Sequence, residues 1–97
     1  MSEIDKMFEK LGYIKNEDKR VIVYKYNQYF NNFKIYKKIY FYKIEKQITL
    51  ISYNLTEDIR IDFNITMQEL QAINEKCKEL GWNEWRRKES KRIYKRV

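Results

Sequence analysis

Apolar residues near the start of the chain recur at the spacing of a helix. Four of them follow the i, i+3, i+4, i+7 pattern that lines one helix face: Ile4, Met7, Phe8 and Leu11. Ser2 stands where an N-cap is expected, and Gly12 follows the last apolar residue, as in a C-terminal cap. The pattern therefore predicts a short helix over residues 2–11, and the polar residues 16–20 predict a turn after it.

The middle of the chain is rich in β-branched and aromatic residues. Four stretches of this kind predict strands: residues 21–27, 35–44, 47–53 and 59–65. We expect the second and third strands to form a hairpin in which residues 45 and 46 are a two-residue turn. That turn places Phe41 opposite Leu50. Glu-Lys is not a pair that two-residue turns prefer, and the register depends on this turn.

A second helix is expected over residues 66–80, and both of its ends carry signals. Thr66 and Glu69 match the S/T-x-x-E capping box, in which each side chain satisfies a free backbone N–H of the other residue. Gly81 stops the helix, and Trp82 can fold back to make the apolar contact that often follows a glycine cap. One apolar stripe of this helix should be buried: Leu70, Ile73, Cys77 and Leu80.

These elements give the order α-β-β-β-β-α and an α+β fold. Because the connections are short, the four strands should form an antiparallel sheet. Each helix has one apolar stripe, so we expect both helices on one face of the sheet. That face should carry Val21, Val23, Ile39, Phe41, Ile48, Leu50, Ile59, Ile61 and Phe63. Residues 1–82 are then one domain, and residues 83–97 follow it as a basic tail or helical extension.

The opposite face of the sheet is expected to combine tyrosines with basic residues. Its positions are Ile22, Tyr24, Tyr26, Lys38, Tyr40, Tyr42, Thr49, Ile51, Tyr53 and Arg60. The candidate binding residues among them are Tyr24, Tyr26, Lys38, Tyr40, Tyr42 and Tyr53. Rings beside cations are typical of proteins that bind single-stranded nucleic acid, and tyrosine is equally enriched at protein interfaces. A plain solvent face is the third interpretation, because tyrosine has a high β-propensity and its AT-rich codons match the composition of this chain.

The last fifteen residues hold a large share of the positive charge. The net charge of the chain is +7, and residues 83–97 contain seven Lys or Arg against two Glu. The candidate binding residues of this segment are Trp85, Arg86, Arg87, Arg92 and Arg96. Tryptophan and arginine often dominate the energy of interfaces. The segment has three interpretations: a contact for an acidic protein surface, a contact for nucleic acid phosphates, or a solvated tail with no target.

The composition excludes several kinds of catalytic and metal site. No histidine occurs, which removes the commonest general base and metal ligand. The single cysteine cannot form an internal disulfide or a thiolate metal site, and two glycines cannot build a phosphate-binding loop. Carboxylate pairs such as Asp5/Glu9 and Glu75/Glu79 are interpreted as solvated helix faces. We therefore expect no enzyme, no cofactor and no metal.

Location follows from the same features. The chain has no apolar run of about 18 residues and no basic start followed by an apolar stretch, so neither a membrane span nor a secretory signal is expected. A lone cysteine fits a compartment in which thiols stay reduced. We therefore expect a cytoplasmic protein that does not associate with membranes.

Residues 65–82 (ITMQELQAINEKCKELGW) contain the pattern T-M-x-E-L-x-A-I-x-x-K-x-x-E-L-G-W. This segment resembles the C-terminal helix of small uncharacterised proteins from phages and prophages of low-GC Gram-positive bacteria, and the opening EIDKMFEKLGY is similar too. Such small phage proteins are often host-directed inhibitors, including anti-CRISPR proteins. The resemblance therefore implies a protein of the host cytoplasm that blocks a host defence or regulatory protein, or a ribonucleoprotein such as a CRISPR effector, by steric contact.

The residues themselves leave two other functions open. A nucleic-acid-binding accessory protein would use the basic tail and the tyrosine-rich face, and a structural homodimer would form through the sheet.

Overall fold

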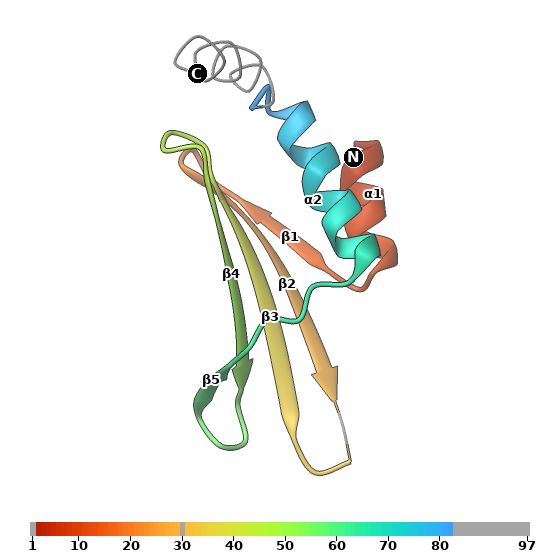
Figure 1. The fold of residues 1–97 in the computed structure, drawn as a ribbon, viewed down its shortest axis with the longest axis vertical. Helices are drawn as coiled ribbons and strands as arrows, with labels where there is room; N and C mark the ends of the chain where they lie inside the picture. The colour runs from red at the N-terminus through yellow and green to blue at the C-terminus, as the bar shows by residue number, and fades with distance from the viewer. Residues whose placement is uncertain (1, 30, 83–97) are drawn as a thin grey trace, which may run out of the picture.

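The computed structural model describes residues 2–29 and 31–82 of the 97-residue chain. It shows an α+β fold with two helices and one antiparallel sheet whose five strands follow in sequence order (Figure 1). The elements are α1 (Glu3–Lys10), β1 (Ile14–Glu17), β2 (Val21–Tyr29), β3 (Lys34–Tyr42), β4 (Gln47–Asn54), β5 (Ile59–Ile61) and α2 (Met67–Glu79). The α+β class and the antiparallel sheet are confirmed, and the sheet has five strands where four were predicted.

The additional strand, β1, is polar, and its last two residues, Asn16 and Glu17, lie in the segment 16–20 that was predicted as a turn. It pairs antiparallel with β2, and Lys15 lies opposite Tyr24. Hydrophobic alternation could not reveal β1, because all four of its residues are exposed. Its charged side chains form ion pairs instead. Lys15 Nζ lies 2.8 Å from Asp5 Oδ2. Lys43 Nζ lies 2.6 Å from Glu17 Oε2.

The last strand is shorter than predicted. Only Ile59–Ile61 pairs with β4, and the chain then leaves the sheet and crosses towards α2 (Figure 1). Phe63 in this crossing segment packs against the core, and Lys37 Nζ lies 4.5 Å from the centre of its ring. Of the apolar residues predicted on one side of this strand, Phe63 therefore packs against the core after the strand has ended, whereas Ile59 and Ile65 are 47% and 40% exposed.

The hairpin between β3 and β4 has a longer turn than predicted. Tyr42 pairs with Gln47, so four residues form the turn, and Phe41 lies opposite Ile48 rather than Leu50. Lys46 adopts a φ of 57°, and its N–H donates to the carbonyl of Tyr42 at 2.8 Å. The predicted register was wrong by two residues. Because side chains alternate with a period of two, this error leaves each residue on its predicted face.

Both helices end in the same way, as the glycines predicted. Gly12 and Gly81 have φ values of 95° and 77°, which glycine adopts without steric cost. The next residue in each case donates its N–H back into the helix. Tyr13 donates to the Phe8 carbonyl at 3.0 Å, and Trp82 donates to the Cys77 carbonyl at 2.9 Å. The aromatic rings of Tyr13 and Trp82 are thereby folded back into the core.

The helix starts are also confirmed. The Ser2 hydroxyl accepts a hydrogen bond from the Asp5 N–H at 3.1 Å. The capping box at α2 is complete: Thr66 Oγ1 accepts from the Glu69 N–H, and Glu69 Oε1 accepts from the Thr66 N–H. Among the described residues, no helix has the length and apolar character needed to cross a membrane.

One buried cluster joins both helices to one side of the sheet. Its members are Phe8, Tyr13, Ile22, Tyr24, Ile39, Phe41, Ala72, Ile73 and Trp82. The predicted phase of β2 was wrong, because Ile22 and Tyr24 enter this core whereas Val21 and Val23 lie on the opposite side. Tyr24 is 0% exposed and its ring stacks on Phe8 at 3.9 Å between centroids. A tyrosine can occupy this position because its hydroxyl meets a buried acceptor, Asp5.

The buried stripe of α2 also differs from the prediction. The buried residues are Glu69, Ala72, Ile73 and Lys76, which follow the i, i+3, i+4, i+7 spacing. Leu70 is 38% exposed, while Cys77 and Leu80 are partly buried at the margin of the core. The helix is therefore rotated about its axis relative to the apolar stripe, because two of its charged side chains find partners inside the protein.

Candidate binding surface

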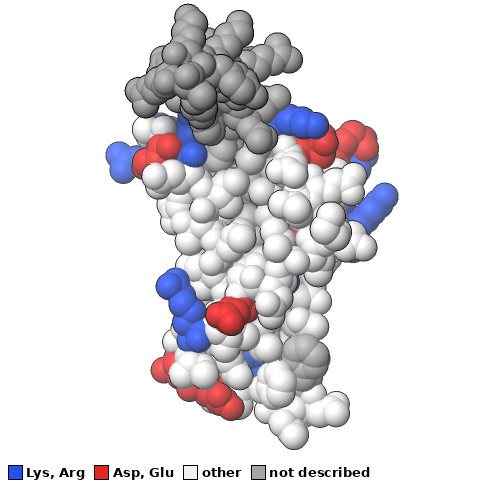
Figure 2. Space-filling model, viewed as in Figure 1, with Lys and Arg blue, Asp and Glu red and all other residues white. Residues whose placement is uncertain are grey.

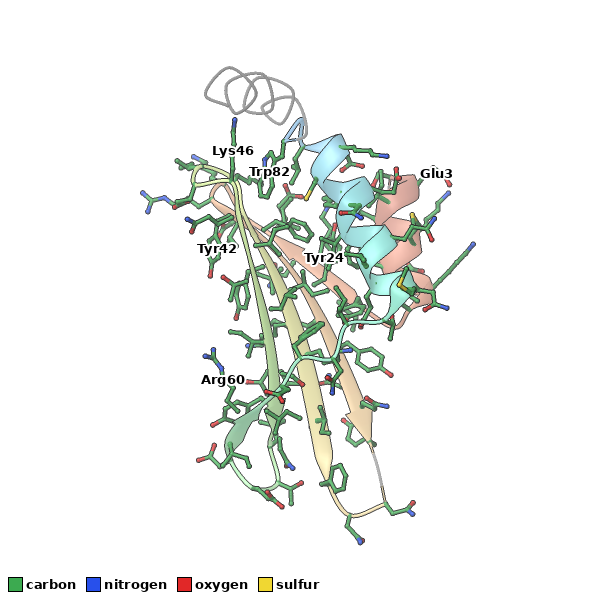
Figure 3. The ribbon with its side chains drawn as sticks, in the orientation of Figure 1. Glu3, Tyr24, Tyr42, Lys46, Arg60 and Trp82 are labelled. Atoms are coloured by element: carbon green, nitrogen blue, oxygen red, sulfur yellow. The ribbon has the colours of Figure 1, made fainter. Side chains whose placement is uncertain are left out.

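The side of the sheet that faces away from the helices is here called the open face. Its strand positions are Ile14 and Asn16 of β1, Val21, Val23, Lys25, Asn27 and Tyr29 of β2, Lys34, Tyr36, Lys38, Tyr40 and Tyr42 of β3, Gln47, Thr49, Ile51 and Tyr53 of β4, and Arg60 of β5. Figure 3 shows Tyr42 and Arg60 projecting from this side, whereas Tyr24 lies between the sheet and the helices.

The open face carries basic residues and no acidic ones at its strand positions. The basic residues are Lys25, Lys34, Lys38 and Arg60. Lys25 and Lys38 lie directly opposite each other on neighbouring strands, an arrangement in which like charges repel. The strands contain one acidic residue, Glu17, which lies on the helix side. The strand positions of the open face are therefore positively charged, and the Asp58 carboxylate, which accepts from the Tyr53 hydroxyl, lies at the margin of this face.

Four tyrosines form two ring pairs on the open face. The rings of Tyr40 and Tyr42 stack with centroids 5.9 Å apart and an angle of 5° between their planes. Tyr36 and Tyr53 pair across β3 and β4 at 5.7 Å. All four side chains are half-buried against their neighbours.

Cations and a hydrogen bond fix some of these rings. Lys38 Nζ lies 5.0 Å from the centre of the Tyr36 ring, and Lys34 Nζ lies 5.1 Å from that of Tyr29. The Tyr53 hydroxyl donates to Asp58 Oδ1 at 2.8 Å, and this hydrogen bond raises the pKa of Tyr53. The surface is thus ordered before any partner arrives.

The structure brings together part of the predicted site. Lys38, Tyr40, Tyr42 and Tyr53 lie on the open face, where the sequence placed them. Tyr24 and Tyr26 do not. Both point to the helix side, where Tyr24 is buried and Tyr26 packs against the core, so their predicted place on this surface was wrong.

Sequence reasoning missed four tyrosine or basic residues that the open face includes: Lys25, Tyr29, Lys34 and Tyr36. Tyr36 shares its parity with Lys38 and Tyr40 along β3, so the alternation of that strand could have found it. Lys25 could be placed only once the phase of β2 was known. The predicted residues of the tail, Trp85, Arg86, Arg87, Arg92 and Arg96, lie outside the described residues.

The helix side holds a buried polar network centred on Asp5. Asp5 Oδ1 accepts hydrogen bonds from Tyr24 Oη at 2.7 Å and from Lys76 Nζ at 3.3 Å. Lys15 Nζ donates to Oδ2 at 2.8 Å. Burial alone would raise the pKa of Asp5, but the hydrogen bonds from Lys15 and Tyr24 and the charge of Lys76 hold that pKa well below its usual range. Asp5 was predicted to lie on a solvated helix face, and that prediction was wrong.

Glu69 is the centre of a second network that links α2 to β3 and to the end of α1. Its Oε2 accepts from the Tyr13 hydroxyl at 2.5 Å and from Lys37 Nζ at 2.7 Å. Burial opposes ionisation of Glu69, but Lys37, Tyr13 and the Thr66 N–H outweigh burial and lower the pKa. Burial and the bond to Glu69 raise the pKa of Tyr13, which therefore stays a neutral donor.

These two networks have the features of structural ion pairs. Each carboxylate already accepts several hydrogen bonds, and within the described residues no buried side-chain polar atom lacks a partner. Residues 2–29 and 31–82 also contain no group of three acidic or cysteine side chains placed to hold a metal ion. The basic side chains of the open face, by contrast, have no carboxylate partner among the described residues.

The chain was compared with family models, with curated proteins and with solved structures, and none of them matches.

Proposed function

We propose that this protein is a non-catalytic binding protein whose open face contacts an acidic surface of another protein. The observation that carries the proposal is the charge of that face, on which four basic side chains stand without an acidic residue at any strand position. Complementary charge speeds encounter and selects the partner, while the tyrosines supply contact area. The basic residues of the segment 83–97 would add to attraction for the same acidic partner.

The packing of the tyrosines favours a protein partner over nucleic acid. Bases stack on ring faces that stand free, whereas the rings of Tyr36, Tyr40, Tyr42 and Tyr53 are half-buried against their neighbours. Val21, Val23 and Ile51 are half-buried among them and add apolar area. A half-buried surface of aromatic and apolar side chains suits the central part of a protein interface.

We further propose that this contact blocks the partner sterically. The resemblance of residues 65–82 to small phage proteins supports inhibition of a host defence or regulatory protein as the biological purpose. The residues of that resemblance serve mainly as helix cap and core, so they bear on fold, and the target has to be found by experiment.

Partner capture with charge-matched variants tests the proposal. Immobilised full-length protein would be incubated with bacterial lysate, and bound proteins identified by mass spectrometry. Lys38→Glu places an acid in the middle of the open face, whereas Lys19→Glu makes the same change of charge in an exposed turn. We expect an acidic protein that the wild type and Lys19→Glu retain and Lys38→Glu loses. Equal recovery by all three proteins would show that the open face is not the binding surface.

A nucleic-acid function is the second candidate, because the open face places cations beside aromatic rings. Its test is fluorescence anisotropy with a labelled single-stranded oligonucleotide across a salt series. If the four basic residues each neutralise one phosphate, log K should fall against log salt with a slope of about −3. Absence of binding at low salt would exclude this candidate.

A further inference from the structure

Strand β4 leaves half of its outer edge without a strand beside it. β5 pairs only with Ser52, Tyr53 and Asn54. Within the described part of the chain, no strand pairs with residues 47–51 on that side. Figure 1 shows β5 beside one end of β4, while the other end runs alone along the margin of the sheet. An edge of this kind offers unpaired backbone groups to another strand.

The free part of β4 lacks the usual protection of edge strands. Residues 47–51 (QITLI) contain no charged residue and no proline, the two devices that most often block edge pairing. Ile48 and Leu50 are 37% and 38% exposed, although their neighbours across the sheet, Phe41 and Ile39, are fully buried. The core therefore ends abruptly at β4. Figure 2 shows few charged side chains over the middle of this view of the molecule.

We propose that a second copy of this chain covers this edge, with residues 48–50 of the two copies paired antiparallel about a two-fold axis at Thr49. This inference goes beyond the proposed function. Antiparallel pairing of identical segments is self-complementary, so one edge serves both partners. Each Ile48 would lie opposite a Leu50 of the other copy, and the exposed apolar side chains would cover one another.

The charges at the two ends of this segment support a second copy as the occupant. β5 ends at Ile61 opposite Ser52, and the chain leaves the sheet at Asp62. In the proposed pairing, Gln47 of the other copy reaches the end of β5. Because Ile61 already pairs with Ser52, the other chain must turn away there, which brings its Lys46 beside Asp62. Lys46 and Asp62 are both exposed, and neither has an ion-pair partner among the described residues. The two-fold axis creates this opposite-charge contact twice.

The dimer would also change the open face. Pairing at β4 would join the two sheets edge to edge, and both open faces would lie on the same side of the joined sheet. Tyr53 and Arg60 of each copy border the joint, so the basic aromatic surface would continue from one copy into the other. A partner would then meet a larger surface than one chain provides.

A charge-swap series tests the proposed register. Sedimentation of the full chain over a concentration series should show a monomer–dimer equilibrium. Lys46→Asp and Asp62→Lys should each weaken dimerisation about tenfold, because each change creates two like-charge contacts. The double variant should restore dimerisation to near the wild-type level. Asp tolerates the positive φ of Lys46, so the first variant should fold normally.

Two further variants keep the test decisive. Leu50→Lys places a charge on the free edge and should abolish the dimer, whereas Leu55→Lys alters an equally exposed leucine in a turn and should not. In a Cys77→Ser background, Thr49→Cys should form a covalent dimer under mild oxidation. A wild-type protein that stays monomeric at the highest attainable concentration would overturn the inference. So would a dimer that resists Leu50→Lys, because it would use another surface.

Discussion

The two faces of the sheet place their cationic side chains in opposite surroundings. On the helix side, the side chains of Lys37 and Lys76 are 14% and 2% exposed, and each has its Nζ within 2.7 Å of a carboxylate. On the open face, Lys25, Lys34, Lys38 and Arg60 have no carboxylate partner among the described residues, and two of them lie over tyrosine rings instead.

This difference matches a division between folding and the binding function that we propose. A buried charge must be paired within the protein, because burial without a partner costs several kcal/mol. An exposed charge needs no internal partner and adds to the field that attracts ligands. The helix side therefore uses charge to fix the positions of α1 and α2, whereas the open face keeps its charge available. Each prediction below alters one side of this comparison.

The largest effect is expected from Asp5→Ala. This change leaves Lys76, which is 2% exposed, with fewer acceptors and removes the acceptor of the Tyr24 hydroxyl. We expect the free energy of unfolding to fall by about 3–5 kcal/mol, measured by urea denaturation. Glu3→Ala is the matched control, because Glu3 lies in the same helix with an exposed side chain and should cost less than about 0.5 kcal/mol. Similar losses for both variants would contradict a buried network at Asp5.

Acid should destabilise the protein through the same carboxylates. The folded state lowers the pKa of Asp5 and Glu69 below their usual values of 3.8 and 4.5, so the unfolded state binds more protons in acid. Stability should be constant above both values and fall as the pH drops through them. With no histidine in the chain, no further step is expected near neutral pH.

Two conservative variants check the origin of the acid effect. Glu69→Gln keeps an acceptor for the capping box but removes the titrating group. Asp5→Asn keeps an acceptor for the Tyr24 hydroxyl and removes the titrating group of the other network. Urea denaturation across a pH series should give a shallower acid dependence for each variant than for the wild type. An unchanged dependence would assign acid unfolding to other carboxylates.

The two glycine caps should differ in their tolerance of a side chain. A Cβ at Gly12 would lie 2.5 Å from Cε2 of the Tyr26 ring, whereas a Cβ at Gly81 meets nothing within 4 Å. Both positions have positive φ, so Gly81→Ala should cost about 1–2 kcal/mol from backbone strain alone. Gly12→Ala should cost about 1–2 kcal/mol more, because Tyr26 must move. Equal melting temperatures for the two variants would contradict the close approach at Gly12.

The parts of the fold that the sequence predicted are those that local signals determine. The Ser2 cap, the Thr66–Glu69 capping box and the glycine stops depend on residues within five positions of one another, and all of them were confirmed. The faces of β3 and β4 were also correct, because a two-residue error in register does not change the side on which a residue lies.

The parts that were missed depend on partners distant in sequence. Tyr24 enters the core because it meets Asp5, nineteen residues away, and Lys76 is buried because it meets the same carboxylate seventy-one residues away. Hydrophobicity scales treat tyrosine and lysine as surface residues. The apolar periodicity therefore predicted Tyr24 on the wrong face of the sheet and predicted that α2 buries Leu70. For the candidate site the consequence was direct: Tyr24 and Tyr26 were included, and Tyr36 and Lys25 were omitted.

The smallest effect on stability is expected from a substitution on the open face. This substitution should stabilise the protein, whereas those above destabilise it. Lys25→Thr removes the like-charge pair with Lys38 and introduces a residue of higher β-propensity, so the free energy of unfolding should rise by about 0.5 kcal/mol. The same change should weaken capture of an acidic partner. Lys19→Thr, in an exposed turn, controls for net charge and should change neither property. Urea denaturation and partner capture on the same preparations give both readouts. A gain in stability together with a loss of binding would show that the repulsion between Lys25 and Lys38 lowers the stability of the fold while Lys25 contributes to binding. A loss of stability would contradict the repulsion between Lys25 and Lys38.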